Sequence, residues 1–431
     1  MKEMSSEKYY KEIDIKPEKD KQAFEENEAM QMALRSMEKR EKELNPEEKE
    51  DLEKMVEGAR NVMKCFNLKR SSDNKRGENL VVVTDTGVDE LVRIAIAKAA
   101  HEAAGDDARV IVTPSPEHPA QDFLETVGQK IKHADAILYA TSISRSHSKE
   151  SSELLNAHPN ELVAKVQEWR KKRRGVDFPT NSRLISITTT TKEILTEGAS
   201  QEDPKQIQKR VEKMYEAMED VKKAYISSEA GTNLEVDIKE NTVIADDGRI
   251  NKPGMASNFP VGEWACAPNL AKTNGVLVVD GAATNIGRVD KPMRIEIKNG
   301  VAVKIEGGKA AKKLEKMLKE ANEELKKKNP KSKSNAFRVA ELGFGMNSKA
   351  FRYNEKGEKI SPPTSLEGEK GLGTIHIAFG RNTLFRIKKE DPDYNDVPIH
   401  IDNVVMKPTV VGEKKNGEKV KIIKNGEFSI E

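Results

Sequence analysis

The sequence predicts a two-part α/β protein, in which a mainly parallel, three-layer α/β domain is followed by a β-rich α+β domain. The first part shows short continuous apolar runs, LVVV at 80–83, RVIV at 109–112 and AILYA at 136–140, separated by amphipathic helical stretches. Strands that are apolar throughout are typical of a parallel sheet covered by helices on both faces. The second part instead shows alternating strands and Asn-Gly pairs, which indicate antiparallel hairpins.

The chain divides into a charged N-terminal extension over 1–45, the α/β domain over 46–203 and the β-rich domain over 204–431. Asn45 can cap a helix that has Pro46 at its first position. Apolar residues then recur at helical spacing, so this helix should pack on the first domain; they are Leu52, Met55, Ala59, Val62 and Met63.

Further elements follow in chain order. The pattern predicts helices over 88–104 and 120–131 and a strand over 183–187, then a helix over 204–221 that leads into the second domain. Strands are expected at 234–238 and 276–280, and a hairpin turns at Asn299-Gly300. One more helix has an apolar stripe made by Leu314, Leu318, Ala321 and Leu325.

Composition excludes several classes of function. The 74 basic and 72 acidic residues give a net charge near +2, so nucleic acid is not an expected partner, and the basic run at 170–174 is interpreted as a solvated helix end. No apolar stretch suits a membrane span or a secretory signal, and a cytoplasmic location is expected. Two distant cysteines cannot make a disulfide framework or a Cys-rich zinc site, so any metal must be held by histidines and carboxylates. No phosphate-binding fingerprint occurs, so a nucleotide cofactor is not expected.

Three potential metal-ligating side chains lie on two predicted strands near the C-terminus. His400 and Asp402 are two positions apart, so they point to the same face of a strand. His376 alternates with Ile375 and Ile377 and therefore faces away from them. A strand histidine can also be a hydrogen-bonded core residue, so the spacing alone leaves both interpretations open.

Two glutamates occupy local sequences that are unusual for a surface carboxylate. Glu263 ends the turn sequence NFPVGE, and Glu341 opens ELGFGMN after an apolar pair. Each could simply accept hydrogen bonds from backbone N–H groups of a tight turn. With the two histidines and Asp402, however, they would give three carboxylates and two imidazoles, which is enough to hold a pair of divalent cations. Arg145 and His147 follow the third strand and are weaker candidates for a role near the substrate.

Four segments in order, SNFPVGEWACAP, AELGFGMN, GEKGLGTIHIAFG and HID, resemble the thermophilic metallo-aminopeptidases of the aminopeptidase T and aminopeptidase S type. The resemblance covers roughly residues 80–405. It implies an α/β first domain, a metal-binding second domain, a homodimer, and five metal ligands, namely Glu263, Glu341, His376, His400 and Asp402. One position departs from the pattern, because Thr383 stands where the better-known members carry a tyrosine.

The leading hypothesis is therefore a metallo-aminopeptidase that removes N-terminal residues from peptides with a water activated by two divalent ions, zinc, cobalt or manganese. A second hypothesis uses His376, His400 and Asp402 as a facial set for Fe(II) in a ring-opening dioxygenase of the dihydroxypyridine type, a group similar to this family. A third hypothesis is a non-catalytic metal-binding scaffold whose extension, 1–45, docks another protein.

Overall fold

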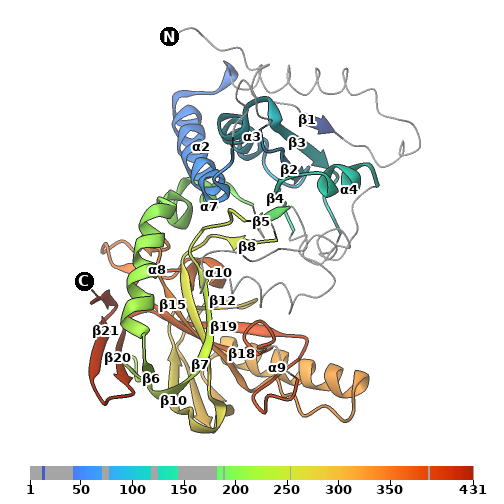
Figure 1. Cartoon of the computed structure of the whole chain (residues 1–431). Coiled ribbons are helices and arrows are strands. Elements are labelled where there is room, and N and C mark those ends of the chain that lie inside the picture. Colours follow the sequence, from blue (N-terminus) through green and yellow to red (C-terminus); the bar gives the residue numbers. More distant parts are fainter. Residues whose placement is uncertain are drawn as a thin grey trace. The chain divides into compact units, whose positions relative to one another are not determined.

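The computed structural model describes residues 12–14, 42–69, 77–117, 125–143, 182–187, 190–252, 254–386 and 389–430 (Figure 1). The chain forms two compact units. The first consists of Met1–Pro204 together with Gly248–Phe259, and the second consists of Lys205–Asp247 together with Pro260–Glu431. Residues 248–259 were expected in the second domain, but in the structure they belong to the first unit.

The first unit is built on a six-stranded sheet in the order β1-β3-β2-β4-β5-β8. All neighbouring strands are parallel, as the apolar runs predicted. The strands are β1 (Glu12–Asp14), β2 (Leu80–Asp85), β3 (Ala108–Thr113), β4 (Ala136–Ala140), β5 (Arg183–Ile187) and β8 (Ala256–Phe259). The segment 248–259 belongs to this unit because its strand β8 pairs with β5 at the edge of the sheet.

Helices cover both faces of this sheet. The chain moves from β2 to β3 through α3 (Glu90–Ala104), then back past β2 to β4 through α4 (Glu125–Lys132). Because such crossovers are right-handed, opposite directions of travel place the two helices on opposite faces. The packing agrees, since Val127 and Ile131 of α4 share one apolar cluster with Val81 and Val83 of β2. The expected three-layer arrangement is confirmed.

The helix expected after Asn45 is confirmed as α2 (Pro46–Phe66). Asn45 accepts a hydrogen bond from the backbone N–H of Glu48, and the Glu48 side chain accepts one from the backbone N–H of Asn45. This reciprocal capping box satisfies two N–H groups that the first turn of a helix leaves free. Two further described helices lie between β5 and the second sheet in the sequence, namely α7 (Lys192–Thr196) and α8 (Pro204–Met218).

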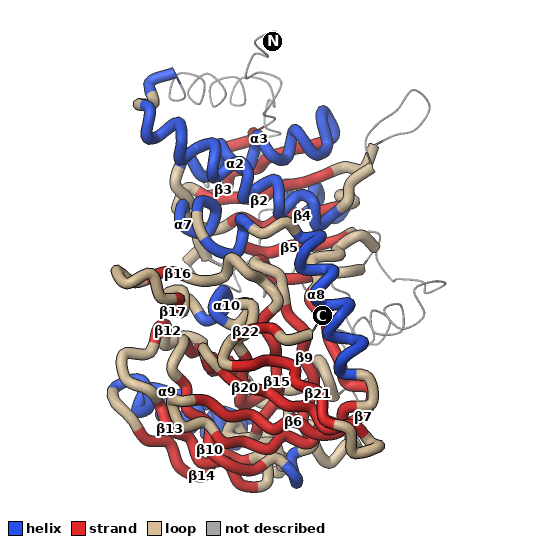
Figure 2. The backbone as a smooth tube through the Cα atoms, turned by 90° about the vertical axis from the view of Figure 1, so that its left-hand side faces the viewer, coloured by secondary structure: helices blue, strands red, loops and turns tan. Residues whose placement is uncertain are grey.

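The second unit contains a 14-stranded sheet in which all pairs are antiparallel. Its strands include the red segments labelled β6, β7, β9, β10 and β13–β15 in Figure 2. Its main path is β12-β11-β19-β18-β15-β9-β7-β6-β20-β21-β22, and β10, β13 and β14 branch from β7. The strands are β6 (Val221–Ser228), β7 (Asn233–Asp246), β9 (Glu263–Pro268), β10 (Asn274–Val279), β11 (Ala282–Ala283), β12 (Gly287–Arg288), β13 (Met293–Lys298), β14 (Val301–Glu306), β15 (Val339–Gly345), β18 (Ile375–Gly380), β19 (His400–Val405), β20 (Pro408–Lys414), β21 (Lys419–Lys424) and β22 (Glu427–Phe428).

Shorter elements complete the second unit. A separate pair of strands is formed by β16 (Arg352–Tyr353) and β17 (Lys359–Ile360), and α10 (Ser365–Gly368) precedes β18. The long helix α9 (Lys309–Lys328) packs against β13 and β14 and buries Leu314, Leu318 and Ala321, three members of the predicted stripe.

The predicted hairpin at Asn299-Gly300 joins β13 to β14. Both residues have positive φ, 49° and 68°, as a type I′ turn requires. Gly300 is also needed for space, because a Cβ there would lie 2.7 Å from Cα of Leu270. The Asn416-Gly417 hairpin between β20 and β21 differs, since a Cβ on Gly417 would meet nothing within 4 Å.

This difference makes a matched stability test. Gly417→Ala should lower the free energy of unfolding by about 1–2 kcal/mol, the cost of a left-handed alanine. Gly300→Ala adds a backbone clash and should lower the free energy of unfolding by about 1–3 kcal/mol more. Urea unfolding followed by circular dichroism measures both, and equal midpoints for the two variants would contradict the packing argument.

Candidate metal centre

Four neighbouring strands of the second sheet, β9, β15, β18 and β19, supply the five predicted donor residues. Glu341 and Asp402 both lie opposite Ala378, and His400 lies opposite Gly380. His376 lies opposite Gly343, and Glu263 lies opposite Gly345. Because paired residues and residues two apart share a face, this register places all five donors on one face of the sheet.

Small residues on the same face leave room for the donor side chains. A Cβ on Gly343 would lie 2.0 Å from Cε1 and 2.1 Å from Nε2 of His376, so the imidazole lies directly over the backbone of β15. Gly343, the first glycine of the ELGFG sequence, therefore leaves space for the His376 ring, because a larger residue would displace the ring.

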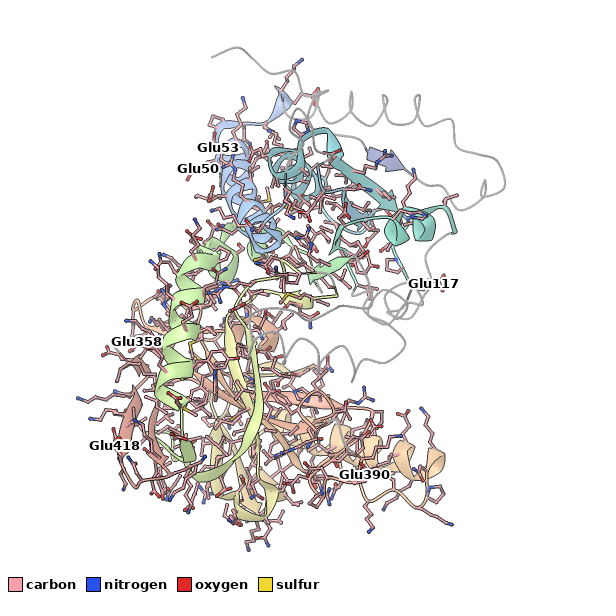
Figure 3. The ribbon with its side chains drawn as sticks, in the orientation of Figure 1. Glu50, Glu53, Glu117, Glu358, Glu390 and Glu418 are labelled. Carbon is pink, nitrogen blue, oxygen red and sulfur yellow. The ribbon has the colours of Figure 1, made fainter. Side chains whose placement is uncertain are left out.

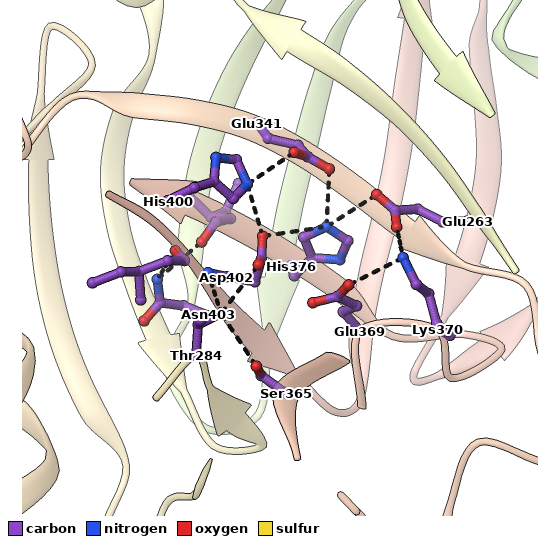
Figure 4. Close-up of polar contacts among 12 residues, drawn as sticks. Glu263, Thr284, Glu341, Ser365, Glu369, Lys370, His376, His400, Asp402 and Asn403 are labelled. Atoms are coloured by element: carbon purple, nitrogen blue, oxygen red, sulfur yellow. Dashed lines mark hydrogen bonds and ion pairs between the residues drawn. The ribbon is translucent and has the colours of Figure 1, made fainter. Parts of the chain in front are cut away.

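The donor atoms converge to hydrogen-bond distances (Figure 4). Nε2 of His376 lies 3.2 Å from Oε1 of Glu341 and 3.5 Å from Oε1 of Glu263. Nε2 of His400 lies 3.2 Å from Oε2 of Glu341 and 3.1 Å from Oδ1 of Asp402. Oδ1 of Asp402 is also 4.0 Å from Nε2 of His376.

Two groups among the described residues could each hold a metal ion. The first comprises Glu263, Glu341 and His376, and the second comprises Glu341, His400 and Asp402; within each group the donor atoms lie within 4.8 Å of one another. Glu341 is shared, and each of its oxygens faces a different imidazole.

Outer hydrogen bonds orient two of these donors. Nδ1 of His400 donates to the carbonyl oxygen of Arg381 at 2.7 Å, which leaves Nε2 as the unprotonated nitrogen when a cation is bound. Oδ2 of Asp402 accepts a hydrogen bond from the Thr284 hydroxyl at 3.1 Å, and Ser365 donates to that hydroxyl at 3.2 Å. These contacts turn Oδ1 of Asp402 toward the histidines. The residues present therefore fit a divalent cation.

The charged groups at this centre are largely buried, whereas many carboxylates elsewhere on the protein are exposed. Exposed carboxylates are common on the surface, as the labelled Glu50 and Glu358 illustrate (Figure 3). At the centre, Glu263, Glu341 and His376 are buried. Burial opposes charge on an imidazole, but the carboxylates of Glu263 and Glu341 outweigh it and raise the pKa of His376 well above its ordinary value.

The second half of the centre behaves in the same way. Burial would lower the pKa of His400, but Asp402 and Glu341 raise it well above the ordinary value. Burial would raise the pKa of Asp402, but His400 holds it below its usual range. In metal-free protein the raised pKa values of both histidines favour protonated imidazoles, whose charge offsets part of the excess of carboxylate.

Two further charged residues at the centre, Glu369 and Lys370, were missed by sequence reasoning. The Lys370 ammonium contacts Oε2 of Glu263 and lies 3.0 Å from Oε1 of Glu369, and both side chains are buried. Burial raises the pKa of Glu369 to about 8. Burial opposes the charge of Lys370, but Glu263 and Glu369 raise its pKa well above the ordinary value. Their position in GEKGLG, directly before the His376 strand, was the available signal.

Three other positions were singled out in the sequence. Arg145 and His147 lie outside the described residues, so their predicted role near the substrate stays a prediction. Thr383 lies in the turn that follows β18.

A model of the 2,5-dihydroxypyridine 5,6-dioxygenase (NicX) family matches residues 61–411. The chain belongs to this family. The match extends over both units and includes all five donor residues. An enzyme is thereby supported over the non-catalytic scaffold, whereas the hydrolase expected from the motifs is not confirmed.

Two solved structures share the fold of this dioxygenase-family chain. The 2,5-dihydroxypyridine dioxygenase from Pseudomonas putida KT2440 is 15% identical, with 88% of this chain and 97% of that chain covered and a TM-score of 0.58. AmpT from Thermus thermophilus is 16% identical, with 89% and 100% covered and a TM-score of 0.55. The resemblance to aminopeptidase T is therefore supported for the fold. The comparison with curated proteins finds no match.

Among the described residues of this chain, no helix has the length and apolar character needed to cross a membrane. The expected cytoplasmic location, peptide substrate and homodimer remain predictions.

The space above Gly343 gives a direct test of the centre. Gly343→Ala should displace the His376 ring and weaken cobalt(II) binding at least about tenfold, because a ligand in the wrong place loses most of its contribution. Isothermal titration calorimetry measures the affinity. Gly308→Ala is the matched control, since the nearest atom to its Cβ would be 3.7 Å away on the flexible Lys291 side chain. Equal affinities in the two variants would contradict the proposed position of the ring.

The raised pKa values of His376 and His400 predict that cation binding releases protons, so affinity should increase as pH rises through neutrality. Calorimetry in two buffers of different ionisation enthalpy counts the protons. The same shifts stabilise the metal-free fold below the unfolded histidine pKa of about 6.5, and this stabilisation is lost as pH rises through the higher folded value. Binding without proton release would contradict this account.

Proposed function

We propose that this chain is a metal-dependent dioxygenase that holds one Fe(II) and opens the ring of a dihydroxypyridine-type substrate. The main observation in support is that both imidazoles face the same oxygen of Asp402. Oδ1 of Asp402 lies 3.1 Å from Nε2 of His400 and 4.0 Å from Nε2 of His376. Two histidines and one carboxylate on one side of an ion are the donor set of non-haem Fe(II) oxygenases. The family match supports the same reading.

Bound Fe(II) would supply the binding and activation of dioxygen next to an electron-rich ring. The protein residues have separate tasks. Arg381 holds the His400 ring through its carbonyl oxygen, and Thr284 holds Oδ2 of Asp402, so that both donors keep their direction without a bound ion. Such fixed donors lose little conformational entropy when a cation binds.

Glu341 is the carboxylate best placed to receive a proton from the substrate. Its two oxygens lie 3.2 Å from the two imidazole Nε2 atoms, so it lies beside the proposed ion-binding position. A hydroxyl group of the ring that entered this position would meet a carboxylate oxygen that can accept its proton.

A second candidate function is a two-ion aminopeptidase acting on peptides with zinc, cobalt or manganese. One specific observation favours it, namely the division of the donors into two groups that share Glu341. A carboxylate that presents one oxygen to each group is suited to bridging two ions. The fold shared with AmpT is compatible with this candidate.

Oxygen uptake discriminates between the candidates. Protein loaded anaerobically with Fe(II) should consume oxygen when 2,5-dihydroxypyridine is added, with loss of the ring absorbance. Asp402→Ala should lower the rate at least about a hundredfold, because it removes the carboxylate that both histidines face.

The exposed Asp290 provides the matched control, and Asp290→Ala should leave the rate unchanged. Amino acids released from unblocked peptides by zinc-, cobalt- or manganese-loaded protein, without oxygen uptake by the iron form, would instead establish the aminopeptidase.

A further inference from the structure

We propose that Lys370 is a built-in cation that occupies the charge position of a second metal ion and limits the centre to one tightly held divalent ion. This inference rests on the proposed metal-dependent function and deepens it, because it places the single ion where His376, His400 and Asp402 face one another with Glu341 alongside, and not beside Glu263. His376 borders this position through its 4.0 Å approach to Asp402.

The contacts of Lys370 place its charge at the first donor group. Its ammonium contacts Oε2 of Glu263, while Oε1 of the same carboxylate faces Nε2 of His376 at 3.5 Å. Glu263 therefore divides its negative charge between an ammonium on one side and the donor group on the other. A divalent ion held by Glu263, Glu341 and His376 would lie next to this ammonium, and the repulsion between them is weakly screened because these side chains are buried.

Among the residues that the structure describes, no lysine or arginine forms an ion pair with the second donor group. The outer oxygen of Asp402 is held by the neutral hydroxyl of Thr284, which orients the carboxylate without cancelling its charge. The two groups thus differ in what holds the outer carboxylate oxygen: an ammonium holds that of Glu263, and a hydroxyl holds that of Asp402.

Lys370 is also fixed by its backbone. Its N–H donates to the carbonyl of Glu367 at 3.1 Å, and its carbonyl accepts from the N–H of Asn347 at 2.7 Å. A carboxyl oxygen of Glu369 lies 3.0 Å from the ammonium and is its second oxygen partner. Lys370 is buried. If the ammonium moved away, the buried Glu263 carboxylate would lose its compensating charge, so an incoming ion does not displace it readily.

The stoichiometry of cobalt(II) binding tests this inference, with isothermal titration calorimetry and the visible d–d spectrum as readouts. Wild-type protein should bind one ion tightly and a second at least about tenfold more weakly. Lys370→Met removes the charge and should bring the second affinity to within about threefold of the first. Lys370→Arg keeps the charge and should behave as wild type.

A second variant separates this effect from misfolding. Lys370→Met leaves the buried carboxyl groups of Glu263 and Glu369 without their ammonium partner, whereas the double variant Lys370→Met with Glu369→Gln also replaces one of these carboxyl groups by a neutral amide. It should also gain the second ion, and circular dichroism checks that each variant is folded.

Two tightly bound ions in wild-type protein would overturn the inference. It would also be overturned if Lys370→Met and the double variant were both folded and each bound only one ion. One tight ion without oxygen uptake would support the inference while the dioxygenase proposal fails, so the two failures are distinguishable.

Discussion

The centre depends on an excess of buried carboxylate that only positive charge can balance. Glu263, Glu341 and Asp402 face one another across four strands, and Glu369 stands beside them. Carboxylates so close together cannot all remain ionised without compensation. The protein provides part of this compensation itself through Lys370, and the remainder comes from protons on the histidines or from a metal. The antiparallel sheet makes the arrangement possible, because its register fixes each donor relative to the next.

The dioxygenase family and the AmpT structure share one fold, so the fold does not decide the reaction. The two candidate reactions proposed above differ in how many cations the donors hold. Five donors with a shared Glu341 permit two ions, while the ammonium beside Glu263 opposes the second. A single charged side chain can therefore separate two reaction types on the same set of strands.

Much of this architecture could be predicted from the sequence. The parallel sheet followed from apolar runs, and the common face of His400 and Asp402 followed from their two-residue spacing. The convergence of Glu263 and Glu341 with these residues came from the family resemblance, because donors that lie on different strands far apart in the sequence carry no local signal of contact. Lys370 was missed since a charged residue in a turn is ordinarily solvated, and only the tertiary structure shows that it is buried. The assignment of β8 to the first unit was missed for a similar reason, as a four-residue strand with two polar residues has little periodicity.

The absence of side-chain bulk at Gly343, Gly345 and Gly380 has a consequence for how such a centre can evolve. The surface beneath the donors is main chain, and point mutation cannot easily change its amide geometry. Exchanging a carboxylate, imidazole or lysine side chain above this main chain alters the charge offered to an ion, while the strand register that fixes the remaining donors is kept.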